Sequence, residues 1–168
     1  MPNVLPMVRR LALAGVLLLP ASLHAQSAPD EWAAVLAVTD SALARISRVD
    51  LVGFTDLMLD SAVIFTAAER AGGVMVGFRR RAADRAAVVT GTFTERGFRP
   101  EVLVSGPMAM VWLPYDFYRN GAWSHCGVDV FTLVKAAGEW RIATLAYTVQ
   151  QPPACERHPD GPPAGAAR

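Results

Sequence analysis

Four long runs of β-forming residues fill the last third of the chain, and they constrain its fold more than any other feature. The runs span residues 98–106, 108–121, 122–138 and 139–150, separated by turn signals at Ser105-Gly106-Pro107, Asn120-Gly121 and Ala137-Gly138. Asn-Gly favours a tight hairpin because both residues accept a positive φ. The pattern therefore predicts an antiparallel meander of four strands.

The segment before these runs begins with a helical pattern. Apolar residues recur at three- and four-residue steps from Trp32 to Ile46, which is typical of an amphipathic helix. Asp50 is a suitable N-cap for a second, short helix that starts at Leu51. The sequence therefore predicts two helices in tandem.

The middle of the chain changes to short β-type runs. Residues 61–69 and 72–78 predict a small hairpin, and the segment 79–91, rich in Ala and Arg, predicts a third helix. Helices followed by a sheet indicate an α+β domain. In such a domain a strongly curved sheet can wrap around the helices and leave a cone-shaped cavity.

The first 25 residues have the layout of a secretory signal peptide. Arg9 and Arg10 precede an apolar run, and cleavage is expected after Ala25, with Ala28 as an alternative. Residues 11–19 are too short to span a bilayer, so we expect no stable membrane anchor. The sequence predicts export, to the periplasm or out of the cell, as a domain over residues 26–151 with a Pro- and Gly-rich tail over residues 152–168.

The charge balance bears on the class of partner. Without Arg9 and Arg10, 14 of the 16 basic residues remain against 15 acidic ones, so the domain is nearly neutral. Nucleic-acid binding normally needs a basic surface, so we expect no nucleic-acid partner.

The two cysteines, Cys126 and Cys155, are interpreted as a disulfide, because an exported protein reaches an oxidising compartment. Closing a loop of this length would stabilise the fold by about 3–4 kcal/mol in the chain-entropy model. The bond would also hold the tail against the Asn-Gly hairpin.

The order of elements resembles the nuclear-transport-factor-2-like (SnoaL-like) superfamily over residues 30–150, and its lumazine-binding-type bacterial branch over residues 111–149. The residues that carry the narrower likeness are Trp112, Pro114, Tyr115, Gly121, His125, Cys126, Gly127, Asp129, Phe131, Gly138, Trp140 and Ile142. The resemblance implies a cone with a pocket on the concave face of the sheet, and homodimers that form through the sheet. It implies no single activity, because such domains include isomerases, dehydratases, hydrolases, cyclases and proteins without a reaction.

Polar residues of the Asn-Gly hairpin are the candidate site. Side chains alternate along a strand, so His125, Asp129 and Phe131 share one face. In the preceding strand Trp112, Asp116 and Tyr118 share a face if no bulge intervenes. About 13 Å separates His125 from Asp129 along an extended strand, unless a bulge at Gly127 shortens the span.

One interpretation of these residues is acid–base chemistry. His125 would be a general base or hydrogen-bond donor, with Asp129 or Asp116 as its partner. Tyr118 or Tyr115 would donate to a developing oxyanion.

In the ligand-binding interpretation Trp112 and Phe131 form the apolar wall of the pocket, with Tyr115 and Tyr118 beside them. In a third interpretation the same residues are structural, with His125 bonded within the fold, Asp116 near a turn and the aromatic residues in the core. His125 and Asp129 lack a third ligand at a recognisable spacing, so no metal site is expected. No cofactor motif is present either. We therefore expect a domain that binds a small, partly apolar molecule, with an acid–base enzyme and a non-catalytic dimerisation domain as alternatives.

Overall fold

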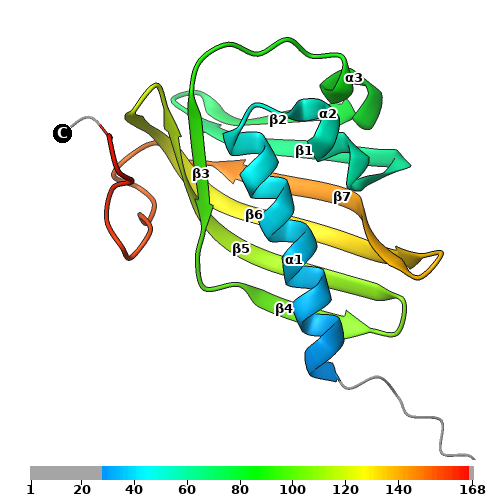
Figure 1. Ribbon diagram of the computed structural model, residues 1–168. Helices are drawn as coiled ribbons and strands as arrows, with labels where there is room; N and C mark the ends of the chain where they lie inside the picture. Colours follow the sequence, from blue (N-terminus) through cyan, green and yellow to red (C-terminus); the bar gives the residue numbers. More distant parts are fainter. Residues whose placement is uncertain (1–27, 167–168) are drawn as a thin grey trace, which may run out of the picture.

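The structure is a computed structural model that describes residues 28–166 (Figure 1). The helices are α1 (Ala28–Ser47), α2 (Leu51–Asp56) and α3 (Arg81–Arg85). The strands are β1 (Met58–Arg70), β2 (Gly73–Arg80), β3 (Phe93–Gly97), β4 (Glu101–Ser105), β5 (Met108–Arg119), β6 (Ala122–Ala136) and β7 (Glu139–Val149). The predicted signal peptide, residues 1–25, lies outside the described residues.

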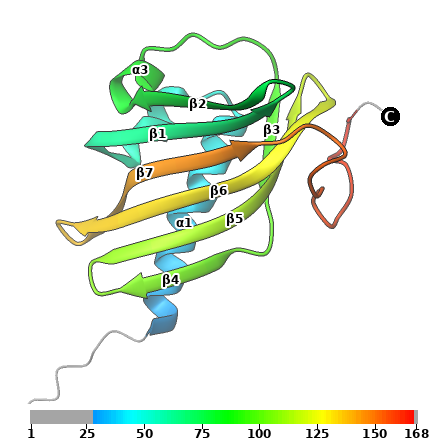
Figure 2. The same cartoon turned by 180° about the vertical axis from the view of Figure 1, so that it is seen from behind.

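All seven strands form one sheet in the order β2-β1-β7-β6-β5-β3, with β4 paired to the other end of β5. Neighbours are antiparallel except β1 and β7, which run parallel. The sheet is curved, and α1 lies across one face of it (Figure 1). Figure 2 shows the opposite face, on which no described helix lies. The predicted α+β fold with a curved sheet and N-terminal helices is confirmed.

Two segments differ from the sequence expectation. The third helix covers only Arg81–Arg85, because Arg79 and Arg80 continue strand β2 and pair with β1. The chain after this helix contains the β-branched pair Val88-Val89, which disfavours further helix. Strand β3 (Phe93–Gly97) was not expected, and it pairs with the end of β5 that leads into the Asn-Gly turn.

The core lies between α1 and one half of the concave face of the sheet. Val35 and Ala42 of α1 are fully buried, and so are Val111, Phe131 and Leu133 from the strands beneath. Phe131 thus belongs to this packed core. Burying such a side chain stabilises the fold by about 1.5–3 kcal/mol.

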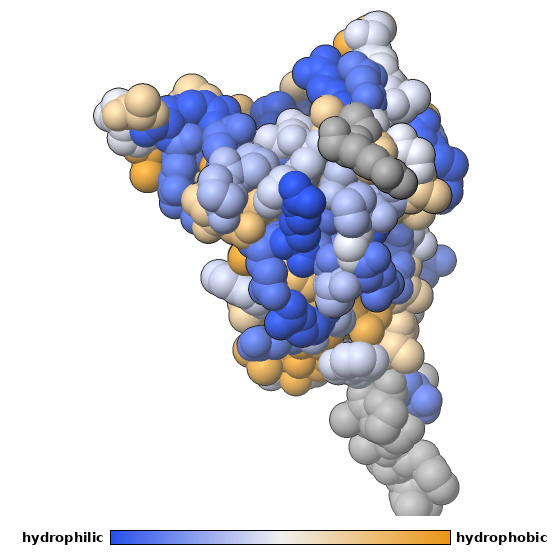
Figure 3. Space-filling model, turned by 90° about the vertical axis from the view of Figure 1, so that its left-hand side faces the viewer, coloured by the Kyte–Doolittle hydropathy of each residue, from blue (hydrophilic) through white to orange (hydrophobic). Residues whose placement is uncertain are grey.

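The tail after β7 is irregular and packs against the sheet near β5 and β6, and Figure 3 shows mostly hydrophilic residues on this side of the molecule. The predicted disulfide between Cys126 and Cys155 is present, with 5.8 Å between the Cα atoms. Beside it, Cys126 and Gln150 exchange both main-chain hydrogen bonds, which carries the ladder one residue beyond β7. Among residues 28–166 no helix is both long and apolar enough to cross a membrane.

Candidate functional site

A cavity of about 220 Å³ lies on the concave face of the sheet, beyond the C-terminal end of α1. It exists because α1 stops at Ser47 and the chain turns at Val49, whose φ of 57° ends the helix. The helix therefore covers only part of the sheet. The last turn of α1 and further elements surround the remaining part of the sheet. They give the cavity these apolar side chains: Ile46, Leu51, Phe54, Phe93, Phe117 and Leu145. The cavity is partly open to solvent.

Strand β6 contributes the two polar residues that its alternation predicts, and both His125 and Asp129 line the cavity. The ring of His125 stacks on Phe117 of β5 with centroids 4.6 Å apart. Between these strands the register shifts by one residue, because Ser124 forms a β-bulge next to the turn.

The bulge determines which residues of β5 lie on the same face of the sheet as His125. A regular ladder from the Asn-Gly turn would place Asp116 opposite His125. The extra residue instead pairs His125 with Phe117 and places Asp116 opposite Cys126, on the other face.

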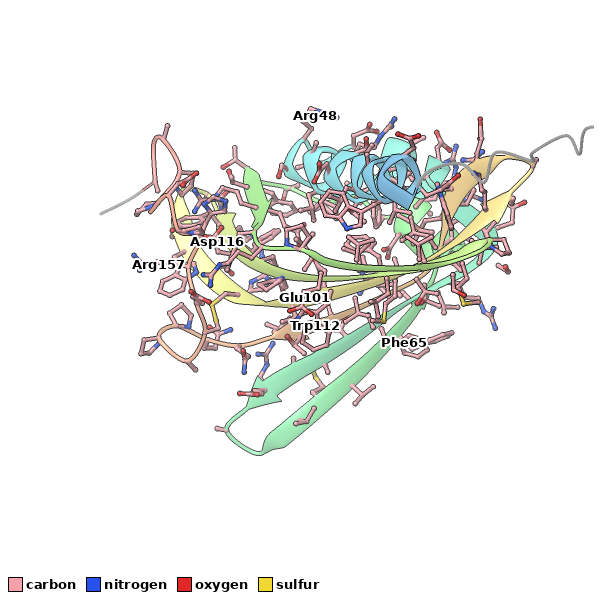
Figure 4. The ribbon with its side chains drawn as sticks, turned by 90° about the horizontal axis from the view of Figure 1, so that it is seen from below. Arg48, Phe65, Glu101, Trp112, Asp116 and Arg157 are labelled. Atoms are coloured by element: carbon pink, nitrogen blue, oxygen red, sulfur yellow. A yellow bond between two sulfur atoms is a disulfide. The ribbon has the colours of Figure 1, made fainter. Side chains whose placement is uncertain are left out.

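Four residues that the sequence suggested for the site lie outside the cavity: Asp116, Tyr118 and Trp112, and Phe131 of the packed core. Asp116 is fully buried beneath the tail, where Arg96 donates to it at 3.0 and 2.6 Å and the His158 main-chain N–H donates at 3.1 Å. The ring of Tyr118 lies under the guanidinium of Arg96. Trp112 is 45% exposed on the side of the sheet away from α1 (Figure 4). These residues do not converge with His125 and Asp129.

The structure adds an acidic residue that the sequence did not indicate. Glu95 lies in β3 opposite Phe117, so its side chain shares the cavity face. Ser47 fixes this strand at the end of α1, since its hydroxyl accepts the Glu95 N–H at 2.9 Å. The spacing of Glu95 two residues after Phe93, which puts both on one face of an extended segment, was the only available signal.

Of the three acids that line the cavity, Asp84 is paired with Arg79, whereas Glu95 and Asp129 each have one oxygen without a hydrogen-bond partner among the described residues. Asp129 is 2% exposed, and its Oδ2 has no hydrogen-bond partner among the described residues. Glu95 is half-buried as a residue, but its Oε2 is fully buried and equally unpartnered. Burial raises the pKa of Glu95 to about 8. Burial, and then the charge of Glu95, raises the pKa of Asp129 well above its usual value.

His125 has the opposite tendency. Burial lowers its pKa to about 4, and the charge of Arg70 acts in the same direction. Its Nδ1 lies 3.0 Å from the hydroxyl of Ser124. The cavity at neutral pH therefore combines a neutral imidazole with carboxyl groups that hold protons.

The one arginine that lines the cavity is fully engaged. Arg79 donates to both carboxylate oxygens of Asp84 at 2.5 and 3.2 Å. Its remaining nitrogen donates to Tyr147 at 3.2 Å and to Thr66 at 3.3 Å. Arg79 therefore forms part of the cavity wall and pairs with Asp84, not with Glu95 or Asp129.

Gly127 shapes the floor between His125 and Asp129. A Cβ there would lie 2.2 Å from the main-chain oxygen of Thr148, so only glycine fits. Tyr115 donates its hydroxyl to that same oxygen at 2.7 Å, and the Val128 N–H turns to the Thr148 hydroxyl instead. Gly127 is thus a close backbone approach and not a bulge, and Tyr115 lines the cavity with its hydroxyl already bonded.

Within residues 28–166 no group of three or more His, Cys, Asp and Glu side chains could hold a metal ion. Apart from the paired Arg79 and Asp84, the cavity presents two acids, one imidazole and an apolar wall. Such a set can bind hydrogen-bond donors or exchange protons with a bound molecule.

A scan against protein-family models and a search of curated proteins found no match to the sequence. Solved structures match across three quarters of the chain. An NTF2-like protein of unknown function from Shewanella baltica is 14% identical, with a TM-score of 0.56 over 74% of this chain and 97% of that one. A proposed dehydratase of the NTF2-like family from Streptomyces avermitilis is 12% identical, with a TM-score of 0.58 over 74% and 99%.

A third match is the beta subunit of a proposed aromatic-ring-hydroxylating dioxygenase from Novosphingobium aromaticivorans. It is 13% identical, with a TM-score of 0.61 over 74% of this chain and 92% of that one. At such identities the likeness concerns the fold alone.

Proposed function

Since the chain has the nuclear-transport-factor-2-like fold, we propose that it binds a small, partly apolar molecule in the cavity beside α1. The apolar side chains around the opening would hold the body of the ligand. Its polar group would meet Glu95, His125 and Asp129.

One observation carries this proposal: Glu95 and Asp129 line the cavity, and each has a buried carboxyl oxygen with no hydrogen-bond partner within residues 28–166. A buried polar atom without a hydrogen bond costs about 1–3 kcal/mol, so proteins rarely keep one without a reason. A ligand that supplies the missing hydrogen bonds would offset that cost.

A thermal-shift screen of small metabolites tests the proposal. We expect stabilisation by a subset of ring-containing compounds, and loss of that stabilisation in Ile46→Phe, which fills the cavity from α1. Trp112→Ala is the matched control, because Trp112 lies on the other side of the sheet and should leave the response unchanged. A screen without hits, or hits that survive Ile46→Phe, would count against the cavity as the binding site.

A second candidate function is acid–base catalysis in the same cavity. A neutral His125 beside protonated Asp129 and Glu95 supplies a base and acids on one wall. The structurally similar protein from Streptomyces avermitilis is a proposed dehydratase, and this activity is consistent with proton transfer.

Deuterium exchange tests this second function directly. A ligand found in the screen is incubated with the protein in D₂O, and proton transfer is expected to place deuterium at an acidic C–H of the ligand. His125→Gln should abolish the exchange while it leaves the thermal shift in place. Binding without deuterium exchange at any ligand position would show that the protein binds the ligand but does not catalyse proton transfer.

A third proposal concerns homodimerisation through the uncovered face of the sheet. Phe65, Phe78, Met110 and Trp112 are all exposed there, and Figure 4 shows the labelled Phe65 and Trp112 on the side away from α1. Monomers rarely expose such a contiguous apolar surface. Sedimentation should give a dimer that Trp112→Arg converts to a monomer, whereas Val88→Arg, on an exposed loop, should not.

We also propose export, on the basis of the leader-like residues 1–25 and the disulfide that an oxidising compartment favours. Cell fractionation of the full chain, with mass measurement of the mature N-terminus, tests it.

A further inference from the structure

Once ionised, the carboxyl groups at the polar end of the cavity offer only acceptors, and the neutral His125 has a single N–H donor. Glu95 and Asp129 each present a buried oxygen without a hydrogen-bond partner in the part of the chain that the structure describes. The hydroxyl of Tyr115 is used by Thr148, and the guanidinium of Arg79 is held by Asp84. Once the two acids ionise, nothing that the structure describes in the cavity can neutralise them.

Two buried carboxyl groups can be stabilised in three ways: by holding protons, by a metal ion, or by a cation that enters with a ligand. A metal ion lacks a third ligand among residues 28–166. A ligand cation would meet both acids and also the aromatic rings of Phe54, Phe93 and Phe117, whose faces attract positive charge.

We propose that the cavity selects a small monoamine, that is, a protonated ammonium group on an apolar, ring-sized body. This proposal rests on the proposed binding function and names the ligand class for the same cavity. An ammonium group carries three donors and no acceptor, which matches the unpartnered oxygens of Glu95 and Asp129. The apolar body would lie against the rings at the opening.

Charge and size exclude other ligand classes. An anion would oppose the ionisation of both carboxyl groups, and a neutral alcohol would supply no charge to offset it and a single donor for two buried oxygens. The cavity of about 220 Å³ is smaller than the ~300–1,000 Å³ of pockets for drug-sized ligands. A body of about one ring is therefore the expected size.

Binding of an ammonium should release protons, because it favours the ionised forms of Glu95 and Asp129. The other titratable or charged groups that face these acids come from five elements: Tyr115 of β5, His125 of β6, Tyr147 of β7, Arg79 of β2 and Asp84 of α3. His125 is neutral and Arg79 is paired throughout the range from pH 6.5 to 8.5. The proton release in that range is therefore assigned to the two acids.

Titration calorimetry on the full chain tests the proposal with three probes that share one ring: benzylamine, benzyl alcohol and benzoate. At pH 8 we expect benzylamine to bind at least tenfold more tightly than either of the others. Buffers with different ionisation enthalpies should reveal proton release with benzylamine and none with benzyl alcohol.

Two variants remove the acids without changing their shape. Asp129→Asn and Glu95→Gln should each weaken benzylamine binding by tenfold or more, and should leave benzyl alcohol binding within about twofold. Asp160→Asn and Glu101→Gln, which alter acids on the exposed surface, are the matched controls and should bind benzylamine like the parent.

The outcomes separate this inference from the proposed function. Equal or tighter binding of benzoate or benzyl alcohol, abolished by Ile46→Phe, would overturn the monoamine while the cavity remained a binding site. Benzylamine binding that survives Asp129→Asn and Glu95→Gln would also overturn it. No binding of any probe, together with an empty metabolite screen, would remove both proposals.

Discussion

Asp116 and Asp129 lie on neighbouring strands, β5 and β6, and both are almost completely buried, yet their surroundings are opposite. Asp116 faces the tail and receives three hydrogen bonds, two of them from Arg96. Asp129 faces the cavity, where its Oδ2 receives none among the described residues.

The difference teaches that burial of a carboxyl group does not by itself indicate function. Asp116 is enclosed by its own chain, because Arg96 and the tail residue His158 complete its hydrogen bonds. The Oδ2 of Asp129 lacks a hydrogen-bond donor among the described residues, and a bound ligand can supply one. Removing one partner of a satisfied buried pair should therefore destabilise the fold, whereas neutralising an unsatisfied acid should not.

The largest expected effect comes from Asp116→Asn. This change leaves the guanidinium of Arg96 buried beside a neutral amide that can no longer accept both of its hydrogen bonds. We expect a loss of about 3–5 kcal/mol in the free energy of unfolding, the usual cost of breaking a buried ion pair. Urea denaturation at pH 7 with the disulfide intact measures it.

Asp129→Asn is the matched comparison for that experiment. It replaces a carboxyl group whose Oδ2 has no hydrogen-bond partner among the described residues, so the free energy of unfolding should stay within about 1 kcal/mol of the parent or rise. If both variants lost the same free energy of unfolding, the distinction between a hydrogen-bonded and an unpartnered buried acid would be wrong.

A smaller effect is expected when the disulfide is removed by Cys155→Ala. The bond closes a loop of 29 residues, which is worth about 3.6 kcal/mol in the chain-entropy model, and strain or residual structure usually makes the measured value smaller. The tail should also loosen from Asp116, so trypsin should cleave sooner after Arg157, whose guanidinium stacks on Trp123 at 3.7 Å in the closed tail. An unchanged digestion pattern would show that the contacts around Asp116 hold the tail without the bond.

Much of this comparison could be predicted from the sequence, because alternation along one strand depends only on local geometry. His125 and Asp129 share a face in the structure as their spacing predicts, and the two cysteines are paired. Relations between strands were harder to predict. The single-residue bulge at Ser124 moves Asp116 to the face opposite His125, and neither neighbouring residue indicates it.

Glu95 was missed for a different physical reason. Its strand, β3, has only five residues, and its position depends on pairing with β5 and on the contact with Ser47 at the end of α1. Such tertiary contacts override the weak propensity of a short segment. The cavity itself depends on where α1 ends, which the sequence fixes only to within a turn.

The smallest expected effect is a pH dependence of stability that only the cavity produces. The folded pKa of Glu95, about 8, is above its unfolded value of 4.5, so the unfolded chain loses this proton first as pH rises. Stability contributed by the protonated acid is full below pH 4.5 and declines up to about pH 8. Asp129 acts in the same direction.

His125 opposes this trend, but only at lower pH. Its folded pKa of about 4 is below the unfolded 6.5, so its contribution grows from pH 4 to 6.5 and is constant above. Between pH 6.5 and 8.5 the acids act alone, and we expect the free energy of unfolding to fall by about 1–2 kcal/mol. Glu95→Gln should flatten this slope, also because the charge that raises the pKa of Asp129 is gone, whereas Glu101→Gln should keep it. A slope that persists in both Glu95→Gln and Asp129→Asn would place the responsible group outside the cavity.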